Sequence, residues 1–154
     1  MGKKPKTQAQ RDGITDAHYR KDYNITLRDY EYLAKQHDGK CWVSDRPPVT
    51  RRLHVDHDHS WTKVKIDTAK SDNTWAASAE YNGVLYVSTS AKRSLAVRDL
   101  KQTLLRASVR GLLSYNINAG LQKFSDSPEL LRAAADYLEK FKQGSPLIGR
   151  TEEK

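Results

Sequence analysis

The sequence contains little cysteine and no long apolar stretch, and each shortage excludes a class of protein. Cys41 is the single cysteine among 154 residues, which excludes an internal disulfide and a cysteine-rich zinc site. No apolar run approaches the roughly 20 residues that a membrane-spanning helix needs. The basic N-terminus is not followed by the apolar stretch of a secretory signal. We therefore expect a cytoplasmic protein in a reducing environment, with no membrane partner.

What the chain does contain is a large excess of positive charge. The formal net charge is +8 and the isoelectric point is about 9.6. The basic residues gather in two segments, 1–28 and 60–110, on either side of a histidine-rich run. This distribution suits contact with the phosphates of a polyanion. Charge alone does not separate that interpretation from a basic protein that binds no nucleic acid.

The length of the chain suits one compact domain with tails. Residues 1–22 have no apolar periodicity, so we expect a flexible basic arm there. We expect a single domain over 23–143 and a tail over 144–154. Residues 60–109 have the pattern of an insertion with its own structure.

Local signals predict helices and strands around this insertion. Thr26 is a suitable N-cap for a helix over 26–36, which Gly39 ends. Residues 41–43 and 53–56 have the composition of short strands, and together they predict a hairpin.

Inside the insertion, Asn82-Gly83 between strand-forming residues predicts a second hairpin. A helix is expected over 95–105, where apolar residues recur at helical spacing. After the insertion we expect a helix over 110–121 and a last helix that Ser127 caps.

The chemistry of the sequence is concentrated in one run. Three of the five histidines lie in Leu53-His54-Val55-Asp56-His57-Asp58-His59. A carboxylate such as Asp56 suits a hard cation, and a neutral imidazole such as His57 accepts a proton from water near pH 7. Hydrolysis of a phosphodiester needs both functions. Because neighbouring residues of a regular strand face opposite sides, this pair works best at a strand end.

Two other interpretations of the run remain open at this point. One is a solvated loop in which the histidines are grouped by chance. The other is a zinc site that uses His54, Asp56, His57 or His59, since histidine and aspartate also bind zinc. Spacing alone does not separate these alternatives.

Several runs in the right order carry a resemblance to a known family. They are Tyr23-Asn24-Ile25-Thr26-Leu27-Arg28-Asp29-Tyr30-Glu31, Gly39-Lys40-Cys41 and the histidine run, followed after the insertion by Arg110-Gly111-Leu112-Leu113, Asn118, Gly120-Leu121 and Ser127-Pro128-Glu129-Leu130-Leu131 through Tyr137-Leu138. About half of the chain thus resembles the phage recombination endonuclease VII group of HNH (ββα-metal) nucleases. The resemblance implies an α+β fold with a ββα-metal core, flanking helices and an inserted β-hairpin plus helix.

The resemblance also implies the roles of individual residues. Asp56 and the side-chain oxygen of Asn118 would bind one divalent ion, Mg²⁺ or Mn²⁺. His57 would be the general base, and His54 and His59 would support the site or contact the phosphate. Four basic residues are expected to contact DNA, namely Arg110, Lys63, Lys65 and Arg93.

The chain departs from this family at its structural zinc site. The positions of the two cysteine pairs are occupied by Cys41, Ser44, Ser114 and Ile117, so a structural zinc is not expected. Leu121 stands where the family often has an acidic residue. The insertion is the natural substitute for the lost zinc, because its apolar residues can extend the core: Trp75, Tyr81, Val84, Leu85, Tyr86 and Val87.

The function that the resemblance implies is a divalent-metal-dependent endonuclease that hydrolyses DNA and nicks it or resolves branched forms. Its partner would be double-stranded or branched DNA in the host cytoplasm. The helix around 27–34 is a candidate for a homodimer contact, although such an apolar face more often packs into a core. The alternatives are a non-catalytic nucleic-acid-binding protein that retains the fold and a zinc-dependent hydrolase of another substrate.

Overall fold

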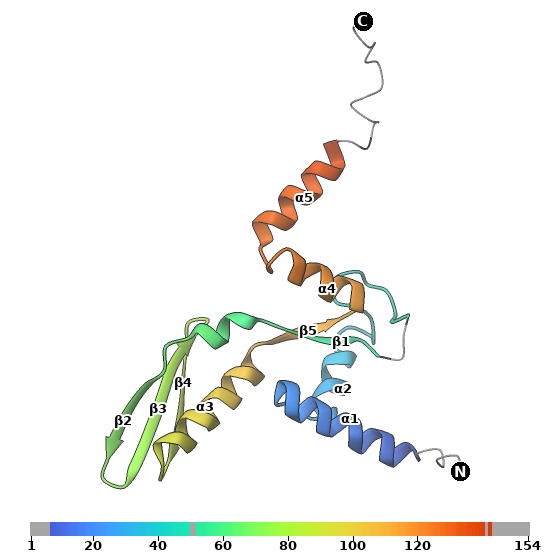
Figure 1. Cartoon of the computed structure of the whole chain (residues 1–154). Helices are drawn as coiled ribbons and strands as arrows, with labels where there is room; N and C mark the ends of the chain where they lie inside the picture. The colour runs from blue at the N-terminus through green and yellow to red at the C-terminus, as the bar shows by residue number, and fades with distance from the viewer. Residues whose placement is uncertain (1–6, 50–51, 141, 143–154) are drawn as a thin grey trace, which may run out of the picture. The chain divides into compact units, whose positions relative to one another are not determined.

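The computed structural model describes residues 7–49, 52–140 and 142, and it combines helices with two antiparallel sheets (Figure 1). The helices are α1 (Gln8–Tyr23), α2 (Leu27–Lys35), a short 3-10 helix η1 (His59–Lys63), α3 (Arg93–Ala107), α4 (Tyr115–Lys123) and α5 (Pro128–Lys140). The strands are β1 (His54–His57), β2 (Asp67–Ser71), β3 (Thr74–Tyr81), β4 (Val84–Ser90) and β5 (Val109–Leu113). The α+β class is therefore confirmed. The chain divides into two compact units after Ser114.

The smaller sheet pairs β1 with β5, two strands that are far apart in the sequence. They run antiparallel, with His54 opposite Leu113 and Val55 opposite Leu112. Val55, Leu112 and Leu113 are buried. The Tyr30 hydroxyl from α2 fixes the start of β1, because it donates to the carbonyl oxygen of Leu53 and accepts from the Leu53 N–H.

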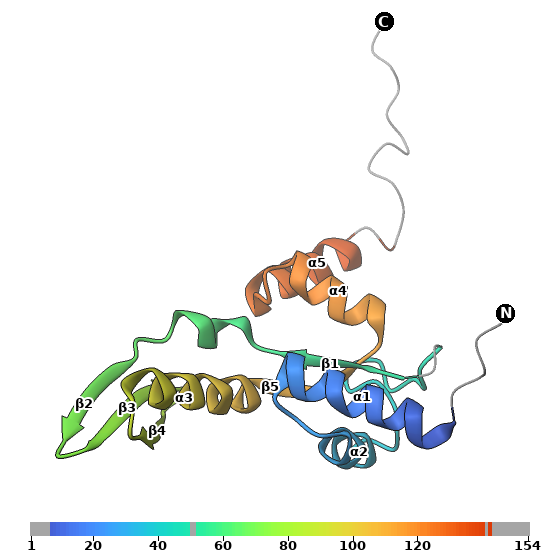
Figure 2. The same cartoon turned by 60° about the horizontal axis from the view of Figure 1, so that its bottom comes forward.

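The larger sheet has the order β2-β3-β4, and α3 packs against β3 and β4 (Figure 2). The predicted hairpin is confirmed: β3 and β4 are joined by Asn82-Gly83, both with positive φ (51° and 75°), as the tightest hairpin turns require. A core forms between the sheet and α3 from Ala77, Ala79, Tyr81, Ala96, Leu100 and Leu104. The predicted helix over 95–105 is confirmed as part of α3. We call β2, β3, β4 and α3 together the inserted module.

The predicted contribution of the insertion to the core is only partly correct. Tyr81 is buried, and Trp75 and Tyr86 pack against the core between the sheet and α3. Val84 and Leu85, in contrast, are 50 % and 68 % exposed, and Val87 is also exposed. These three exposed side chains of β4 therefore do not extend the core.

The predicted strand over 41–43 and its hairpin pairing with 53–56 were wrong, and the predicted helix over 110–121 was only partly correct. Residues 41–43 form a turn and not a strand, because the Cys41 N–H donates to Arg46 and the Asp45 N–H donates to Cys41. Strand β1 pairs with β5 in place of the predicted hairpin partner. The predicted helix over 110–121 is in fact the end of β5 followed by α4.

Gly111 shows why β5 passes close to the turn that precedes β1. A Cβ atom at this position would lie 2.8 Å from Cε3 of Trp42, so only glycine fits without a shift. The Trp42 N–H donates to the carbonyl oxygen of Leu112 at 3.0 Å. Gly111 is thus a glycine within a strand at a point where another segment of the chain approaches closely.

The predicted N-terminal arm also differs from the structure, because residues 8–23 form α1. Thr7 and Gln10 begin this helix with a reciprocal capping box, a local signal that stands outside apolar periodicity. The helices predicted at Thr26 and after Ser127 are confirmed as α2 and α5, each with its expected N-cap hydrogen bond. Residues 1–6 of the arm and the predicted tail over 144–154 lie outside the described residues.

No helix in the described part of the chain combines the length and the apolar character needed to cross a membrane.

Candidate functional site

The histidine run begins in β1 and leaves it at an irregularity in the sheet. Asp56 lies opposite Gly111, whereas the next residue, His57, lies opposite Val109. Arg110 is therefore an extra residue on β5, a β-bulge of the kind that changes the direction of side chains beside active sites. The shift in pairing register falls between Asp56 and His57, at the end of β1.

Asp56 is buried, with 7 % of its surface exposed, and it is paired with the bulge residue. Arg110 donates from Nε to Oδ2 of Asp56 at 2.7 Å and from Nη2 to Oδ1 at 2.9 Å. This two-bond geometry is the strongest form of an arginine–carboxylate contact. Arg110 was predicted to contact DNA, and the structure places its guanidinium on the predicted metal ligand.

Two of the three histidines in the run lie together. The ring centroids of His57 and His59 are 4.3 Å apart, and the ring of Tyr23 lies 5.3 Å from His57 in an edge-to-face arrangement. His54 sits at the beginning of β1 and is exposed. The structure thus groups His57 with His59 and places His54 at the other end of the strand.

Asp58 connects this site to the inserted module. Its Oδ2 accepts hydrogen bonds from the Ser60 hydroxyl at 2.6 Å and from the Tyr81 hydroxyl at 2.9 Å, and its backbone N–H donates to Ser108. Burial on its own would raise the pKa of Asp58, but the bonds from Ser60 and Tyr81 lower it overall. Asp58 is therefore a charged N-cap of η1.

Sequence reasoning assigned no role in the site to Tyr23 or Tyr81. The short Asp58-x-Ser60 spacing, typical of a capped turn, was a usable signal for the role of Asp58. No local pattern predicts the contact between Tyr81 and Asp58, because Tyr81 belongs to β3 and lies 23 positions away from Asp58 in the sequence.

Two of the four positions that the resemblance matches to zinc cysteines, Ser44 and Ser114, contact the thiol at a third, Cys41. Cys41 is fully buried. Burial raises the pKa of its thiol, but hydrogen bonds from the Ser44 side chain and from the backbone of Ser114, Ser44 and Val43 outweigh this and lower the pKa to about 6. Serine hydroxyl and backbone groups thus contact Cys41 at these positions.

The remaining predicted site residues lie elsewhere. Asn118 belongs to α4, in the second unit, and is half-buried. Lys63 ends η1, Lys65 is paired with Asp67 at 3.0 Å, and Arg93 begins α3. Within the described residues, no three side chains among histidine, cysteine, aspartate and glutamate are grouped as metal ligands.

Comparison with known proteins identifies the family. The family model for recombination endonuclease VII matches residues 16–140, which include α2, the histidine run, the inserted module, α4 and α5. Neither the curated proteins nor the solved structures contain a match to this chain. Because the matched segment covers most of the sequence, the chain belongs to the recombination endonuclease VII family.

Proposed function

We propose that this protein is an HNH endonuclease that depends on a divalent metal ion and hydrolyses phosphodiester bonds of DNA. Membership of an endonuclease family supports a nuclease that acts on DNA. The observation that supports the finer proposal is the register irregularity opposite the bulge residue Arg110 of β5, which falls between the buried residue Asp56 and the half-buried residue His57 at the end of β1.

The donor chemistry of the two proposed ligands suits Mg²⁺ or Mn²⁺. Asp56 and Asn118 offer carboxylate and amide oxygens, which these hard cations prefer. Asp56 is buried and already pairs with a positive group, since its Oδ2 lies 2.7 Å from Nε of Arg110. A bound ion would supply charge neutralisation at the phosphate and at the leaving oxygen.

His57 is the proposed general base. This residue ends β1 and is half-buried, and the rings of Tyr23 and His59 lie next to its imidazole. In the neutral form it accepts a proton from the water that attacks phosphorus, a role worth about 10²–10⁴ in rate. His59, beside it, is proposed to support His57 or contact the phosphate, and exposed His54 is proposed to contact the phosphate.

The substrate we propose is double-stranded or branched DNA, which the enzyme nicks or resolves. The net charge of +8 supports a polyanionic substrate. Lys63, Lys65, Arg93 and Arg110 are the proposed phosphate contacts. Arg110 would contact a phosphate after release from Asp56, since Nε and Nη2 of its guanidinium donate to that carboxylate.

A plasmid-cleavage assay with Mg²⁺ or Mn²⁺ tests this proposal. We expect cleavage by the wild type and a loss of about 10²–10⁴-fold in His57→Ala, with a comparable loss in Asn118→Ala. Asn116→Ala is a matched control for Asn118→Ala, since Asn116 is an exposed asparagine on the same helix α4. Equal activity in all four proteins would contradict the assignment. No cleavage by the wild type, together with tight DNA binding, would favour a non-catalytic binding protein.

A further inference from the structure

Tyr23 forms the edge-to-face contact with His57 described above, and it is the last residue of α1. The two ring planes are inclined by 73°. Aromatic pairs of this geometry are worth about 0.5–1.5 kcal/mol beyond the area that they bury. A ring held in this way has fewer accessible rotamers, which matters for an imidazole that must meet a water molecule in one orientation.

The position of Tyr23 is in turn fixed by the residue that follows it. Asn24 ends α1 in the left-handed conformation, with φ of 51°, and its backbone N–H donates to Arg20 and Tyr19. Its side-chain amide donates to the carbonyl oxygen of Gln102, in α3, at 2.9 Å. Tyr23 therefore lies next to a residue that is tied to the inserted module.

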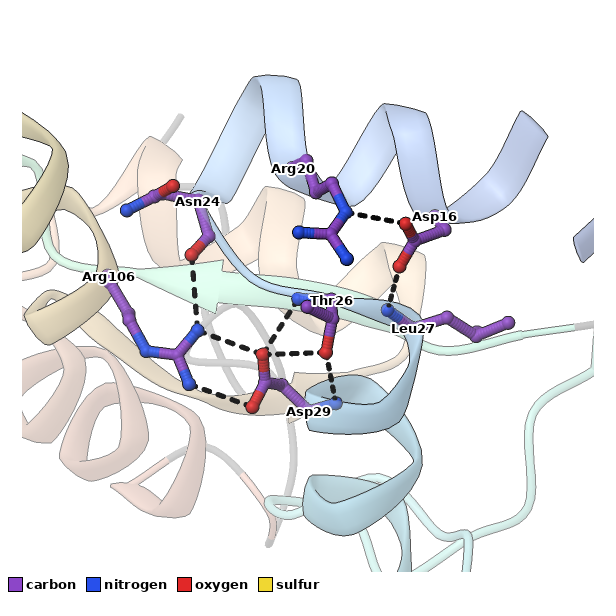
Figure 3. A network of polar contacts seen from close by, with 7 residues as sticks. All are labelled: Asp16, Arg20, Asn24, Thr26, Leu27, Asp29 and Arg106. Carbon is purple, nitrogen blue, oxygen red and sulfur yellow. Dashed lines mark hydrogen bonds and ion pairs between the residues drawn. The ribbon is translucent and has the colours of Figure 1, made fainter. Parts of the chain in front are cut away.

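A second contact from α3 closes the same corner. Arg106 donates to the carbonyl oxygen of Asn24 at 3.3 Å and to both carboxylate oxygens of Asp29 at 2.8 Å (Figure 3). Asp29 also accepts hydrogen bonds from the backbone and hydroxyl of Thr26, the N-cap of α2. Helix α3 thus holds the end of α1 and the beginning of α2 together.

The module is anchored to the histidine run as well. The Tyr81 hydroxyl donates to Asp58, and the carbonyl oxygen of Ser108, directly after α3, accepts from the Asp58 N–H at 2.9 Å. The module consequently contacts both the residue that follows His57 and the residue that follows Tyr23. A continuous set of contacts leads from α3 through Asn24 and Tyr23 to His57.

We propose that Tyr23 is a positioning residue for His57, and that the inserted module holds Tyr23 in place through Asn24. This inference rests on the proposed function, because it assigns a task to the same base. Burial, with the nearby charge of Asp22, raises the pKa of the Tyr23 phenol, so the group is neutral near pH 7 and does not compete as a base. The aromatic ring, and not the hydroxyl, performs the task.

Substitutions at Tyr23 separate positioning from chemistry in the plasmid-cleavage assay. We expect Tyr23→Leu to lower kcat by about 10–100-fold with KM nearly unchanged, since small misplacements of a catalytic group have effects of this size. Tyr23→Phe should restore kcat to near the wild-type value. Tyr32→Leu is a matched control, because Tyr32 is 63 % exposed on α2.

Asn24→Gly tests the link to the module without replacing Tyr23. Glycine adopts the left-handed conformation without strain, so the substitution removes only the side-chain bond to Gln102. We expect a decrease in kcat in the same direction as Tyr23→Leu and smaller, about threefold, consistent with the loss of one modest hydrogen bond. Wild-type kcat in Asn24→Gly would overturn the role of the module, and this variant also remains informative if Tyr23→Leu does not fold.

A measurement without DNA separates this inference from the proposed function. In NMR spectra of protein with ¹⁵N-labelled histidine, Tyr23→Leu should shift and broaden the His57 imidazole signals, whereas Tyr23→Phe should leave them in place. Unchanged signals and unchanged kcat in Tyr23→Leu would overturn the inference. Equal loss of activity in Tyr23→Phe would overturn it too, because the hydroxyl would then act. If the wild type cleaves no DNA, the proposed function fails while the NMR result still decides the position of His57.

Discussion

In each of two regions of the first unit, an arginine donates two hydrogen bonds to the carboxylate of an aspartate. At the α1–α2 corner, Arg106 holds Asp29 with both bonds at 2.8 Å, and in the β1–β5 sheet Arg110 holds Asp56 at 2.7 and 2.9 Å. The bond lengths are nearly identical. The two carboxylates differ in their surroundings, and this difference separates a structural pair from the pair at the proposed metal site.

Both carboxylate oxygens of Asp29 accept hydrogen bonds from groups that connect the helices. Besides Arg106, the backbone N–H and hydroxyl of Thr26 donate to it, and it stands in the first turn of α2. The Arg106 guanidinium, together with Thr26, holds the pKa of this carboxyl far below its usual range. Through Arg106, these contacts connect α3 with the beginning of α2 and the end of α1, so the role of Asp29 is structural.

Asp56 is more deeply buried and lies beside reactive groups. Its side chain is 10 % exposed, against 30 % for Asp29, and the adjacent residue is His57. Among the described residues, the side-chain hydrogen bonds to this carboxylate come from Arg110. Because a buried carboxylate is costly to leave unpaired, release of Arg110 would require a replacement cation. Under the proposed function, Asp56 exchanges Arg110 for a divalent ion, whereas Asp29 keeps its partners.

The largest expected effect comes from the isosteric change at each aspartate. Asp56→Asn should lower DNA cleavage by more than about 100-fold, because the amide retains the shape but loses the charge that holds the ion. Asp29→Asn should keep kcat within about threefold, since its contacts reach His57 only through other residues. Steady-state plasmid cleavage measures both, and similar losses in the two variants would erase the distinction between the regions.

The next effect concerns competition for Asp56. Arg110→Gln should tighten Mn²⁺ binding by about threefold to tenfold, since it removes the positive guanidinium that competes with the metal ion for the Asp56 carboxylate. Isothermal titration calorimetry without DNA measures the affinity. Arg98→Gln is the control, because Arg98 forms a comparable but exposed pair with Asp99. Weaker Mn²⁺ binding in Arg110→Gln would mean that the arginine supports the metal site and does not compete for it.

A smaller effect is expected on stability. Asp29→Asn should lower the free energy of unfolding by about 1 kcal/mol, the range of an N-terminal helix cap and a partly exposed ion pair. This corresponds to a decrease in Tm of about 2–4 °C for a chain of this size. Thermal unfolding followed by circular dichroism measures it, and an unchanged Tm would show that the corner network does not hold the helices together.

The smallest effect is the pH dependence of that stability. Because the pKa of Asp29 is lower in the folded state than the ordinary value of about 3.9, folding favours the deprotonated form. The contribution of Asp29 is therefore fully present above about pH 5 and decreases as the pH falls below about 4. The difference in unfolding free energy between wild type and Asp29→Asn should shrink over that window. A difference that stays constant down to about pH 2.5 would contradict the pairing.

The sequence predicted those elements whose signals are local. The Asn82-Gly83 turn, the Thr26 cap of α2 and the Ser127 cap of α5 are each encoded within a few residues, and each is confirmed. The roles of Asp56 and His57 also follow from residue type and from the family resemblance, and they stay a prediction.

The parts that sequence reasoning missed depend on contacts between distant residues. Arg110 pairs with Asp56 across 54 positions, and Asn24 meets Gln102 across 78. The pairing of β1 with β5 also skips the whole inserted module, so a nearer segment was chosen as its partner. Helix α1 was missed for a different reason, because its stability comes from capping and local ion pairs such as Asp16–Arg20 rather than an apolar stripe.

The central claim is that Asp56 and Asn118 hold one divalent ion beside His57, and crystals of the protein grown with Mn²⁺ test it most directly. The proposed function predicts a single anomalous peak about 2.0–2.2 Å from an oxygen of Asp56 and from the side-chain oxygen of Asn118, with Arg110 released from Asp56. An anomalous peak elsewhere, or an intact Arg110–Asp56 pair at saturating Mn²⁺ with no peak beside it, would contradict the claim.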